Sequence, residues 1–144
     1  MNSKTLRSLS LSAIALSRQF GVRITVEQLE KKISQGQIKS EKELKSTLKE
    51  QGVKVQRLKP SLKTLIERSY YFPCVAILRD GSARILTSCK SNAKNVVEFQ
   101  SIDPLDPTNK MNVETETEFK RSWAGSVYLI SSETGIASQD RIFD

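Results

Sequence analysis

The chain has 144 residues, of which 38% are hydrophobic and 27% are charged, and its formal net charge is +7. A chain of this length is expected to form one domain with a self-sufficient core, and its composition argues against intrinsic disorder. No apolar run approaches the roughly 20 residues that cross a bilayer, and the N-terminus lacks the apolar block of a signal peptide. We therefore expect a soluble, cytoplasmic domain.

The first part of the chain has helical patterns. Apolar residues at three- and four-residue steps from Leu6 to Phe20 predict a helix with one apolar stripe, which Gly21 would end as a C′ residue. The segments Thr25 to Gln28 and Ser40 to Glu43 have the sequence of capping boxes, which predicts the starts of a second and a third helix. Gly52 would close the third helix.

The second part of the chain is predicted to be mostly strands. The expected elements are, in order, a strand at 53–58, a short helical piece at 60–66, a hairpin at 70–87, a β segment at 96–99, a turn-rich loop at 101–107, a short helix at 115–125 and a strand at 127–130. Helices followed by antiparallel strands predict an α+β fold, with the N-terminal helices packed on the sheet. Residues 1–131 would form this domain, and residues 132–144 would be a polar linker.

The hairpin is the strongest strand signal in the chain. Asp80 and Gly81 tolerate positive φ, so we expect a two-residue type I′ turn at this place. That turn would place Leu78 opposite Ala83, and both faces of the two strands would then be apolar. Such a pair is expected in the middle of a sheet that is covered on both sides.

Histidine is absent from the chain, which removes the commonest general base and the commonest metal ligand. Two cysteines, Cys74 and Cys89, cannot build a structural zinc site without it, so no metal is expected, and both are expected to be buried thiols. The charge is uneven, because residues 1–69 carry 15 Lys or Arg and 6 Asp or Glu, whereas residues 70–144 carry 8 and 10. The basic half can be a set of solvated helix faces, or it can attract nucleic acid, anionic lipid or an acidic polypeptide.

Three segments in this order carry a resemblance: Ser8 to Gly21, Phe72 to Leu86, and Ile102 to Gly125. Together they resemble the N-terminal peptidase domain of bacteriocin-exporting ABC transporters, a papain-like cysteine peptidase that removes double-glycine leaders. The resemblance spans about residues 2–131 and implies the papain-like fold.

The resemblance also assigns positions to the catalytic groups. Ser8 stands where the family has its catalytic cysteine, Ala83 where it has histidine, and Asp103 where it has aspartate. Asn2 stands at the oxyanion glutamine. Read from the residues alone, Ser8 would be a helix N-cap, Ala83 a small core residue and Asp103 a turn former. Because a thiolate mechanism needs a thiol and a base, we expect no peptidase activity.

The inactive branch of this family is found in type I secretion ABC transporters that export RTX toxins and adhesins. It is similar to this chain in lacking a complete triad, although its well-known members keep the histidine and a stacking tryptophan, here Ala83 and Ile77. The resemblance implies a non-catalytic domain at the cytoplasmic face of the bacterial inner membrane, which holds an unfolded RTX-type protein near the transporter. Ser8, Ile77, Ala83 and Asp103 would then line the substrate site.

The resemblance implies further partners and leaves two alternatives. The membrane and ATPase domains of the same transporter would follow Asp144 and would act with membrane-fusion and outer-membrane proteins. No cofactor is expected here, and ATP and magnesium would belong to the ATPase domain, because the chain has no Gly-rich phosphate loop. One alternative is an active leader peptidase with Ser8 as nucleophile. The other, a basic nucleic-acid-binding module, rests on charge alone and is not expected.

Overall fold

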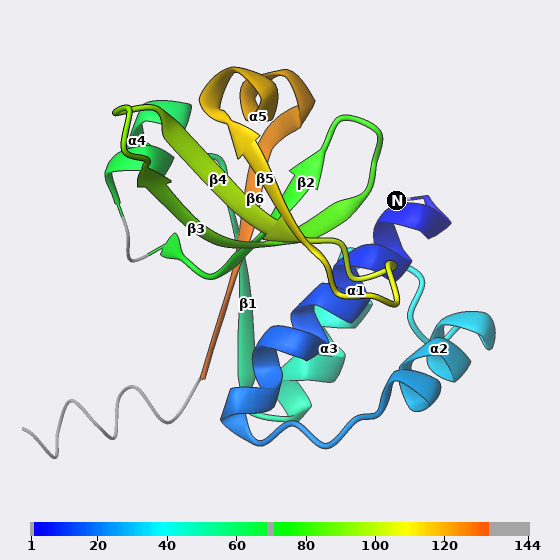
Figure 1. Cartoon of the computed structure of the whole chain (residues 1–144). Helices are drawn as coiled ribbons and strands as arrows, with labels where there is room; N and C mark the ends of the chain where they lie inside the picture. Colours follow the sequence, from blue (N-terminus) through cyan, green and yellow to red (C-terminus); the bar gives the residue numbers. More distant parts are fainter. Residues whose placement is uncertain (1, 69–70, 133–144) are drawn as a thin grey trace, which may run out of the picture.

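The computed structural model describes residues 2–68 and 71–132, which form a six-stranded sheet with helices on both faces (Figure 1). The elements are α1 (Ser3–Ser17), the 3₁₀ turn η1 (Arg18–Phe20), α2 (Val26–Ser34), α3 (Glu41–Glu50), β1 (Val53–Leu58), α4 (Leu62–Glu67), β2 (Cys74–Leu78), β3 (Ala83–Ser91), β4 (Val97–Ile102), β5 (Met111–Thr115), α5 (Glu116–Ser122) and β6 (Trp123–Ser132). Among the described residues, no helix has the length and apolar character needed to span a membrane.

The sheet has the strand order β1-β6-β2-β3-β4-β5, and every neighbouring pair is antiparallel. The last strand, β6, therefore lies between β1 and β2, and the two edges are β1 and β5. Helices α1, α2 and α3 lie on one side of the sheet and α4 and α5 on the other (Figure 1). This arrangement confirms the predicted α+β fold, in which the N-terminal helices pack on an antiparallel sheet.

Two apolar clusters hold these layers together. The cluster on the α1 side joins the first three helices to β1, β2, β3 and β6 through fully buried residues such as Leu9, Leu29 and Leu44. The opposite cluster contains a stack of aromatic rings, in which the centroids of Phe99 and Phe119 are 4.1 Å apart and those of Phe119 and Trp123 are 5.4 Å apart. The central strands are thus covered on both faces, as the sequence predicted.

Helix α1 is buried over more of its surface than a single apolar stripe would require. The buried positions include four serines as well as the apolar residues: Ser8, Ser10, Ser12 and Ser17. The helix begins three residues earlier than predicted, since Asn2 is its N-cap, and its end tightens into η1 before Gly21, which has a φ of 83°. The small side chain of Ser8 lets β3 approach the helix closely, since its hydroxyl accepts the N–H of Ala83.

The capping predictions have two outcomes. Thr25 forms the complete box with Gln28, which confirms the predicted start of α2. Ser40 is the N-cap residue of α3, but the predicted box is wrong, because the Ser40 hydroxyl donates to Glu43 Oε1 at 3.1 Å and accepts no backbone N–H. The Glu43 carboxylate also accepts the N–H of Lys39 at 2.9 Å, so it caps the backbone one residue before the expected place.

The predicted hairpin exists, but its turn and register are different. The N–H of Leu78 donates to the carbonyl of Ser82 at 2.8 Å, so the loop has three residues, 79–81, and only Gly81 has positive φ. This is the turn type that ends in a left-handed glycine. The register shifts by one residue and pairs Ile77 with Ala83, which corrects the predicted pairing of Leu78 with Ala83. Asp80 favours the longer loop, since its Oδ1 accepts the N–H of Ser82 at 2.9 Å.

The region after β4 differs from prediction at two points. Residues 111–115 were not predicted as a strand, yet they form β5, because they pair with β4 from Ile102–Met111 to Glu98–Thr115. Helix α5 ends at Ser122 rather than near residue 125, since Trp123 already begins β6. Most of the predicted linker, residues 133–144, lies outside the described residues, as does Tyr70 at the predicted start of the hairpin.

Candidate functional site

The β2–β3 loop docks on the first turn of α1. Asn2 Oδ1 accepts the N–H of Thr5 at 2.7 Å, and the Thr5 hydroxyl donates to the carbonyl of Gly81. A Cβ at Gly81, whose φ is 89°, would lie 3.0 Å from Thr5 Oγ1 and 3.2 Å from Asn2 Nδ2. An ion pair of 3.4 Å between Lys4 and Asp80 closes the contact at the surface. Glycine thus serves both the turn and the close approach of the helix.

Ser8 lies at the centre of the contact between α1 and β3. Its side chain has no exposed surface. Its hydroxyl donates to the carbonyl of Lys4 at 2.8 Å and accepts the N–H of Ala83, also at 2.8 Å. Ser8 lies in the second turn of α1, so the prediction that it is the N-cap is wrong, and Asn2 takes that role. The hydroxyl instead satisfies the first N–H of β3.

The structure brings Ser8, Ala83 and Ile77 together on the α1 side of the sheet. Ala83 is fully buried, as expected for a small core residue, and it pairs directly with Ile77 across the hairpin. Ile77 is half-buried and packs against the same apolar cluster that contains Ala83. Two strands and one helix therefore meet at these three side chains.

Asp103 follows the end of β4 and makes a local turn. Its Oδ1 accepts the N–H of Leu105 at 2.9 Å, which confirms the turn-forming interpretation. The preceding residue, Ile102, pairs with Ile85, two positions along β3 from Ala83. Asp103 is thus at the neighbouring strand end, but among the described residues no hydrogen bond or ion pair links its carboxylate to Ser8 or to the strand position of Ala83.

The groups around Ser8 offer no base for proton transfer. The methyl side chain of Ala83 cannot accept a proton, and the chain has no histidine. Lys4 faces Ser8 only through its backbone carbonyl, while its Nζ lies 3.4 Å from Asp80 Oδ2. A serine hydroxyl without a base keeps its proton at neutral pH. The arrangement supplies a structural hydrogen bond between helix and sheet.

The two thiols lie elsewhere and are poor nucleophiles. Cys74 is fully buried as expected, whereas Cys89 is only partly buried and packs against the same cluster, on the sheet face opposite α1. Burial raises the pKa of Cys74 to about 12. Burial, together with the negative charge of Glu116, raises the pKa of Cys89 to about 11. Both groups are therefore protonated thiols near neutral pH.

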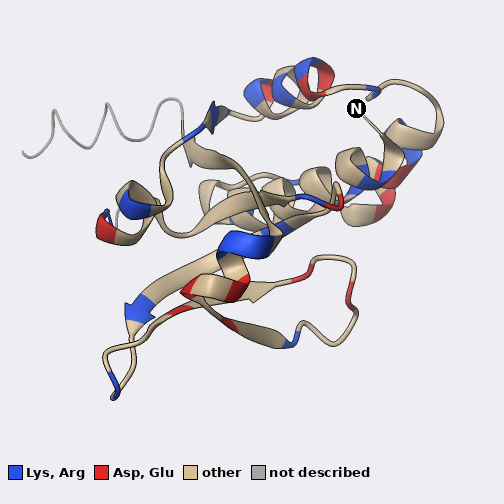
Figure 2. Ribbon diagram, turned by 90° about the horizontal axis from the view of Figure 1, so that it is seen from above, with Lys and Arg blue, Asp and Glu red and all other residues tan. Residues whose placement is uncertain are grey.

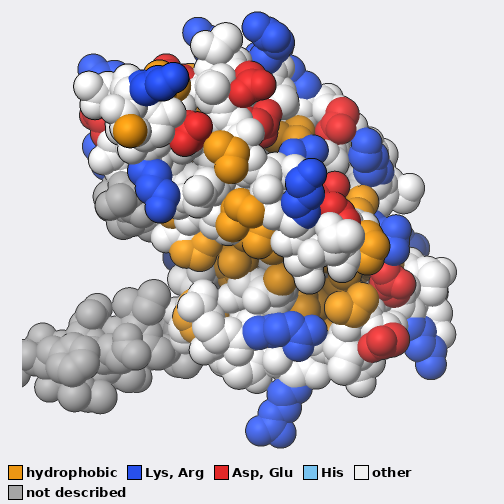
Figure 3. Space-filling model, in the orientation of Figure 1, with side chains coloured by type: hydrophobic (Ala, Val, Ile, Leu, Met, Phe, Trp, Pro, Cys, Tyr) orange, Lys and Arg blue, Asp and Glu red, His pale blue; other side chains and the backbone are white. Residues whose placement is uncertain are grey.

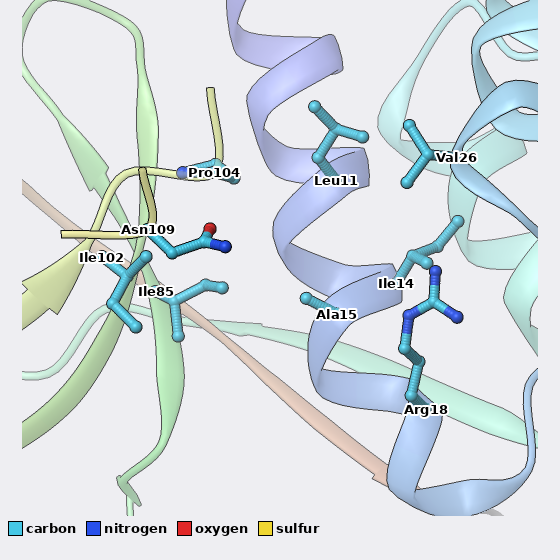
Figure 4. Close-up of a pocket in the computed structure, with 9 residues that line it drawn as sticks. All are labelled: Leu11, Ile14, Ala15, Arg18, Val26, Ile85, Ile102, Pro104 and Asn109. Carbon is cyan, nitrogen blue, oxygen red and sulfur yellow. The ribbon is translucent and has the colours of Figure 1, made fainter. Parts of the chain in front are cut away.

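An apolar groove opens beside this region, between α1 and the ends of β3 and β4. Figure 3 shows hydrophobic side chains gathered in a hollow across the middle of the molecule. The groove has a volume of about 140 Å³ and is lined by Leu11, Ile14, Ala15, Arg18, Val26, Ile85, Ile102, Pro104 and Asn109. Helices α1 and α2 supply one wall, and the sheet with the loop after β4 supplies the other (Figure 4).

Two polar side chains mark this apolar groove. Figure 4 shows the side chain of Arg18 extending toward Ile14, while the amide of Asn109 points toward α1 from the opposite wall. Within the described residues, the Arg18 guanidinium has no ion pair or hydrogen bond. An apolar cavity with one unpaired cation is suited to an apolar segment that also carries a carboxylate. In the sequence, Leu11 lies off the apolar stripe that runs from Leu6 to Phe20, and this offset was the only local signal for the groove.

Comparison with protein families gives a match to the Peptidase C39 family over residues 3–135. The chain belongs to the peptidase C39 family. No curated protein sequence matches it significantly. The family match covers all the described helices and strands, including the groove and the contact between Ser8 and Ala83.

Solved structures of C39 domains share the fold. The double glycine motif protease from an AMS/PCAT transporter, solved with its leader peptide, is 15% identical, with a TM-score of 0.68 and coverage of 92% of this chain and 89% of that one. The peptidase domain of Streptococcus ComA, a bi-functional ABC transporter of a quorum-sensing pathway, is 14% identical, with a TM-score of 0.65 and coverage of 92% and 94%. The N-terminal peptidase C39 like domain of the toxin secretion ATP-binding protein from Vibrio parahaemolyticus is 17% identical, with a TM-score of 0.60 and coverage of 92% and 98%.

Proposed function

We propose that this C39 domain is a non-catalytic docking domain of a type I secretion ABC transporter, which binds an unfolded RTX-type exported protein at the cytoplasmic face of the bacterial inner membrane. One observation carries the proposal. The buried hydroxyl of Ser8 accepts the N–H of Ala83, in a chain that has no histidine. A C39 fold with this pair keeps its architecture but lacks the groups for thiolate chemistry.

In this proposal Ser8, Ala83 and Asp103 occupy the positions of the nucleophile, the base and the orienting carboxylate, and Asn2 that of the oxyanion donor. Peptide cleavage needs a nucleophile whose proton is taken by a neighbouring base. Among the described residues the Ser8 hydroxyl has no such neighbour, and it has no exposed surface on which a peptide carbonyl could approach it. The side chain of Asn2 is engaged as the cap of α1, which supports a structural role for it as well.

The groove beside Ser8 supplies the docking surface. Its apolar walls suit the side chains of an unfolded polypeptide, and Arg18 adds a positive charge that has no partner within residues 2–68 and 71–132. Figure 2 shows Lys and Arg spread over the N-terminal helices. RTX proteins are rich in Asp and remain largely unfolded without calcium, so a basic half with an apolar groove offers them both long-range attraction and a binding site.

The same proposal assigns the other partners. Membrane-spanning and ATPase domains of one transporter would act together with this domain, and membrane-fusion and outer-membrane proteins would complete the exporter. The solved domains that share this fold come from transporters and from a toxin secretion ATP-binding protein, which supports the assignment. ATP and magnesium would be bound by the ATPase domain.

A binding experiment tests the docking function. The domain is titrated with an RTX segment that is unfolded without calcium and with the same segment folded by calcium, and binding is followed by fluorescence anisotropy. We expect binding of the unfolded form, weakened at least about tenfold by Val26→Asp or Arg18→Glu. Val96→Asp is the matched control, because Val96 is exposed to the same extent as Val26, 40%, but lies outside the groove. Equal binding of folded and unfolded segments would contradict the proposal.

A cleavage assay tests the alternative, an active leader peptidase that uses Ser8. That alternative has one argument in its favour, since the chain belongs to a peptidase family. Double-glycine leader peptides are incubated with the domain and with its Ser8→Ala variant. We expect both proteins to leave the peptides intact, and cleavage that is lost in the variant would overturn the non-catalytic assignment.

A further inference from the structure

The two edges of the sheet differ in how they are protected. Strand β1 has Lys54 and Arg57 exposed, and Lys59 and Pro60 follow it directly. Charged side chains and proline at an edge disfavour pairing with a further strand. Strand β5 itself has neither Lys nor Pro, and Lys110 directly precedes it. It exposes Met111 and Val113 instead, at 42% and 52%. Among the described residues, no strand pairs with the outer side of β5.

The backbone of β5 offers hydrogen-bonding groups at this edge. The N–H of Thr115 donates to Glu118 Oε1 at 2.9 Å, which directs it away from β4 although Thr115 is paired with Glu98. Inward and outward backbone groups alternate along an antiparallel strand. Val113 and Met111 therefore also direct their N–H and C=O groups to the outside. No hydrogen bond to these groups is found within the described part of the chain.

The surroundings of this edge are acidic. Between residues 98 and 122, from β4 to the end of α5, the chain carries six Asp or Glu and three Lys or Arg. In Figure 2 the ribbon is red on the loop that leads into β5 and on the first turn of α5, while the last turn of α5 carries Lys120 and Arg121. On β5 itself, Glu114 lies on the sheet face opposite Met111 and Val113, since these side chains alternate. A second copy of the chain that paired through its own β5 would bring two such acidic regions together, so charge complementarity selects a basic partner instead.

We propose that the outer edge of β5 binds an extended, basic polypeptide segment as an additional antiparallel strand, with alternating apolar and Lys or Arg side chains. The apolar side chains lie against Met111 and Val113, and the basic ones face the side of Glu114 and the first turn of α5. The outward backbone groups of Val113 and Met111 supply the hydrogen bonds. This surface is distinct from the groove beside Ser8, and the inference does not depend on the proposed function.

A short capped peptide of alternating valine and lysine is the probe. In antiparallel pairing, a valine directly opposite Met111 or Val113 has its side chain on the same face and its N–H and C=O toward β5, so the valine N–H groups bond to β5. N-methylation of the valines should weaken binding at least about tenfold, and N-methylation of the lysines should change it less than about twofold. A peptide with glutamate in place of lysine should show no binding. Hydrogen exchange should show slower exchange of the Met111 and Val113 amides on binding.

Variants of the protein complete the test. Val113→Pro removes one outward N–H without breaking the ladder to β4, and Val113→Lys adds a repelling charge; each should weaken peptide binding at least about tenfold. Val96→Lys makes the same change outside the edge and should have no effect. Circular dichroism verifies that each variant is folded. Absence of saturable binding, equal effects of the two N-methylated peptides, or self-association that Val113→Pro abolishes would each overturn the proposal.

Discussion

Replacing Ser8 by alanine tests whether its hydroxyl is a structural link between α1 and β3. The substitution removes one oxygen atom and leaves the backbone of the helix unchanged. It deprives the buried N–H of Ala83 of its acceptor, which now lies 2.8 Å away. The hydrogen bond from the hydroxyl to the carbonyl of Lys4 is also lost, but that carbonyl belongs to the helix ladder.

The expected cost follows from two opposing contributions. A buried N–H without a partner costs about 1–3 kcal/mol. Alanine is a better helix former than serine, which should stabilise the folded variant by about 0.5 kcal/mol. The free energy of unfolding should therefore fall by about 1–2 kcal/mol, a large part of the stability of a small domain.

Urea denaturation of Ser8→Ala and Ser12→Ala measures this difference. Ser12 is equally buried in the same helix, but its Oγ has no hydrogen-bond partner. Ser12→Ala should therefore be neutral or slightly stabilising, while Ser8→Ala shifts the midpoint to lower urea with an unchanged slope. If the two variants have equal stability, the hydrogen bond between Ser8 and Ala83 does not hold the helix to the sheet, and the structural role that we assign to Ser8 is wrong.

Three further predictions address other parts of the fold. Gly81→Ala should lower the free energy of unfolding by about 2 kcal/mol, because the φ of Gly81 is 89° and the new Cβ would lie 3.0 Å from a side-chain oxygen of α1. Gly52→Ala should lower it by only about 1 kcal/mol, because Gly52 has a φ of 82° but nothing within 4 Å of the new Cβ. Equal losses in urea denaturation would refute the close contact at Gly81. Glu41→Gln should lower the stability at pH 7 by about 1 kcal/mol. Partial burial raises the pKa of Glu41, but the Tyr128 hydroxyl and two neighbouring cations lower it by more, so the folded-state pKa lies below the ordinary value of 4.5. The contribution of Glu41 is therefore present above about pH 4.5 and is lost as the pH falls through the folded-state pKa, and a difference between the two proteins that persists at pH 2 would contradict this. Alkylation of Cys89 in the native protein should accelerate by about tenfold per pH unit up to pH 10, because only the thiolate reacts and burial raises the pKa of Cys89 to about 11. An alkylation rate that stops rising near pH 9 would show that Cys89 has an ordinary thiol pKa and would contradict this prediction.

The parts of the fold that could be predicted from the sequence are those fixed by neighbouring residues. The capping box at Thr25 holds the start of α2 through contacts three residues apart and forms as expected, and Thr115 holds the predicted helix of α5 in the same way. The loop of the hairpin could not be predicted in the same way. Asp80 and Gly81 are compatible with loops of two or three residues, and the choice depends on side-chain hydrogen bonds to Ser82 and on the contact of the loop with α1. A single residue of loop length then changes the register of the whole hairpin.

The site shows the same division between local and distant contacts. The resemblance to C39 peptidases led to Ser8 and Ala83 as neighbours, and the structure joins them across 75 residues of sequence. No local pattern indicates that the serine accepts a hydrogen bond from the strand, so Ser8 was assigned as a cap. Strand β5 was missed for a related reason, since its five residues become a strand only by pairing with β4. The groove could not be predicted either, because its walls come from segments far apart in the sequence: α1, α2, β3 and the loop after β4.

The two proposed binding surfaces have opposite charge, and this makes their tests independent. The groove presents Arg18 among apolar side chains, whereas the edge of β5 lies among carboxylates. A groove ligand should carry acidic residues and an edge ligand basic ones, so raising the salt concentration should weaken both, but exchanging the charges of a peptide should move it from one surface to the other. Val26→Asp should therefore leave the valine–lysine peptide bound, and Val113→Pro should leave the unfolded RTX segment bound. A polypeptide that carries both kinds of segment would be held at two points, and its retention would exceed what either surface provides alone.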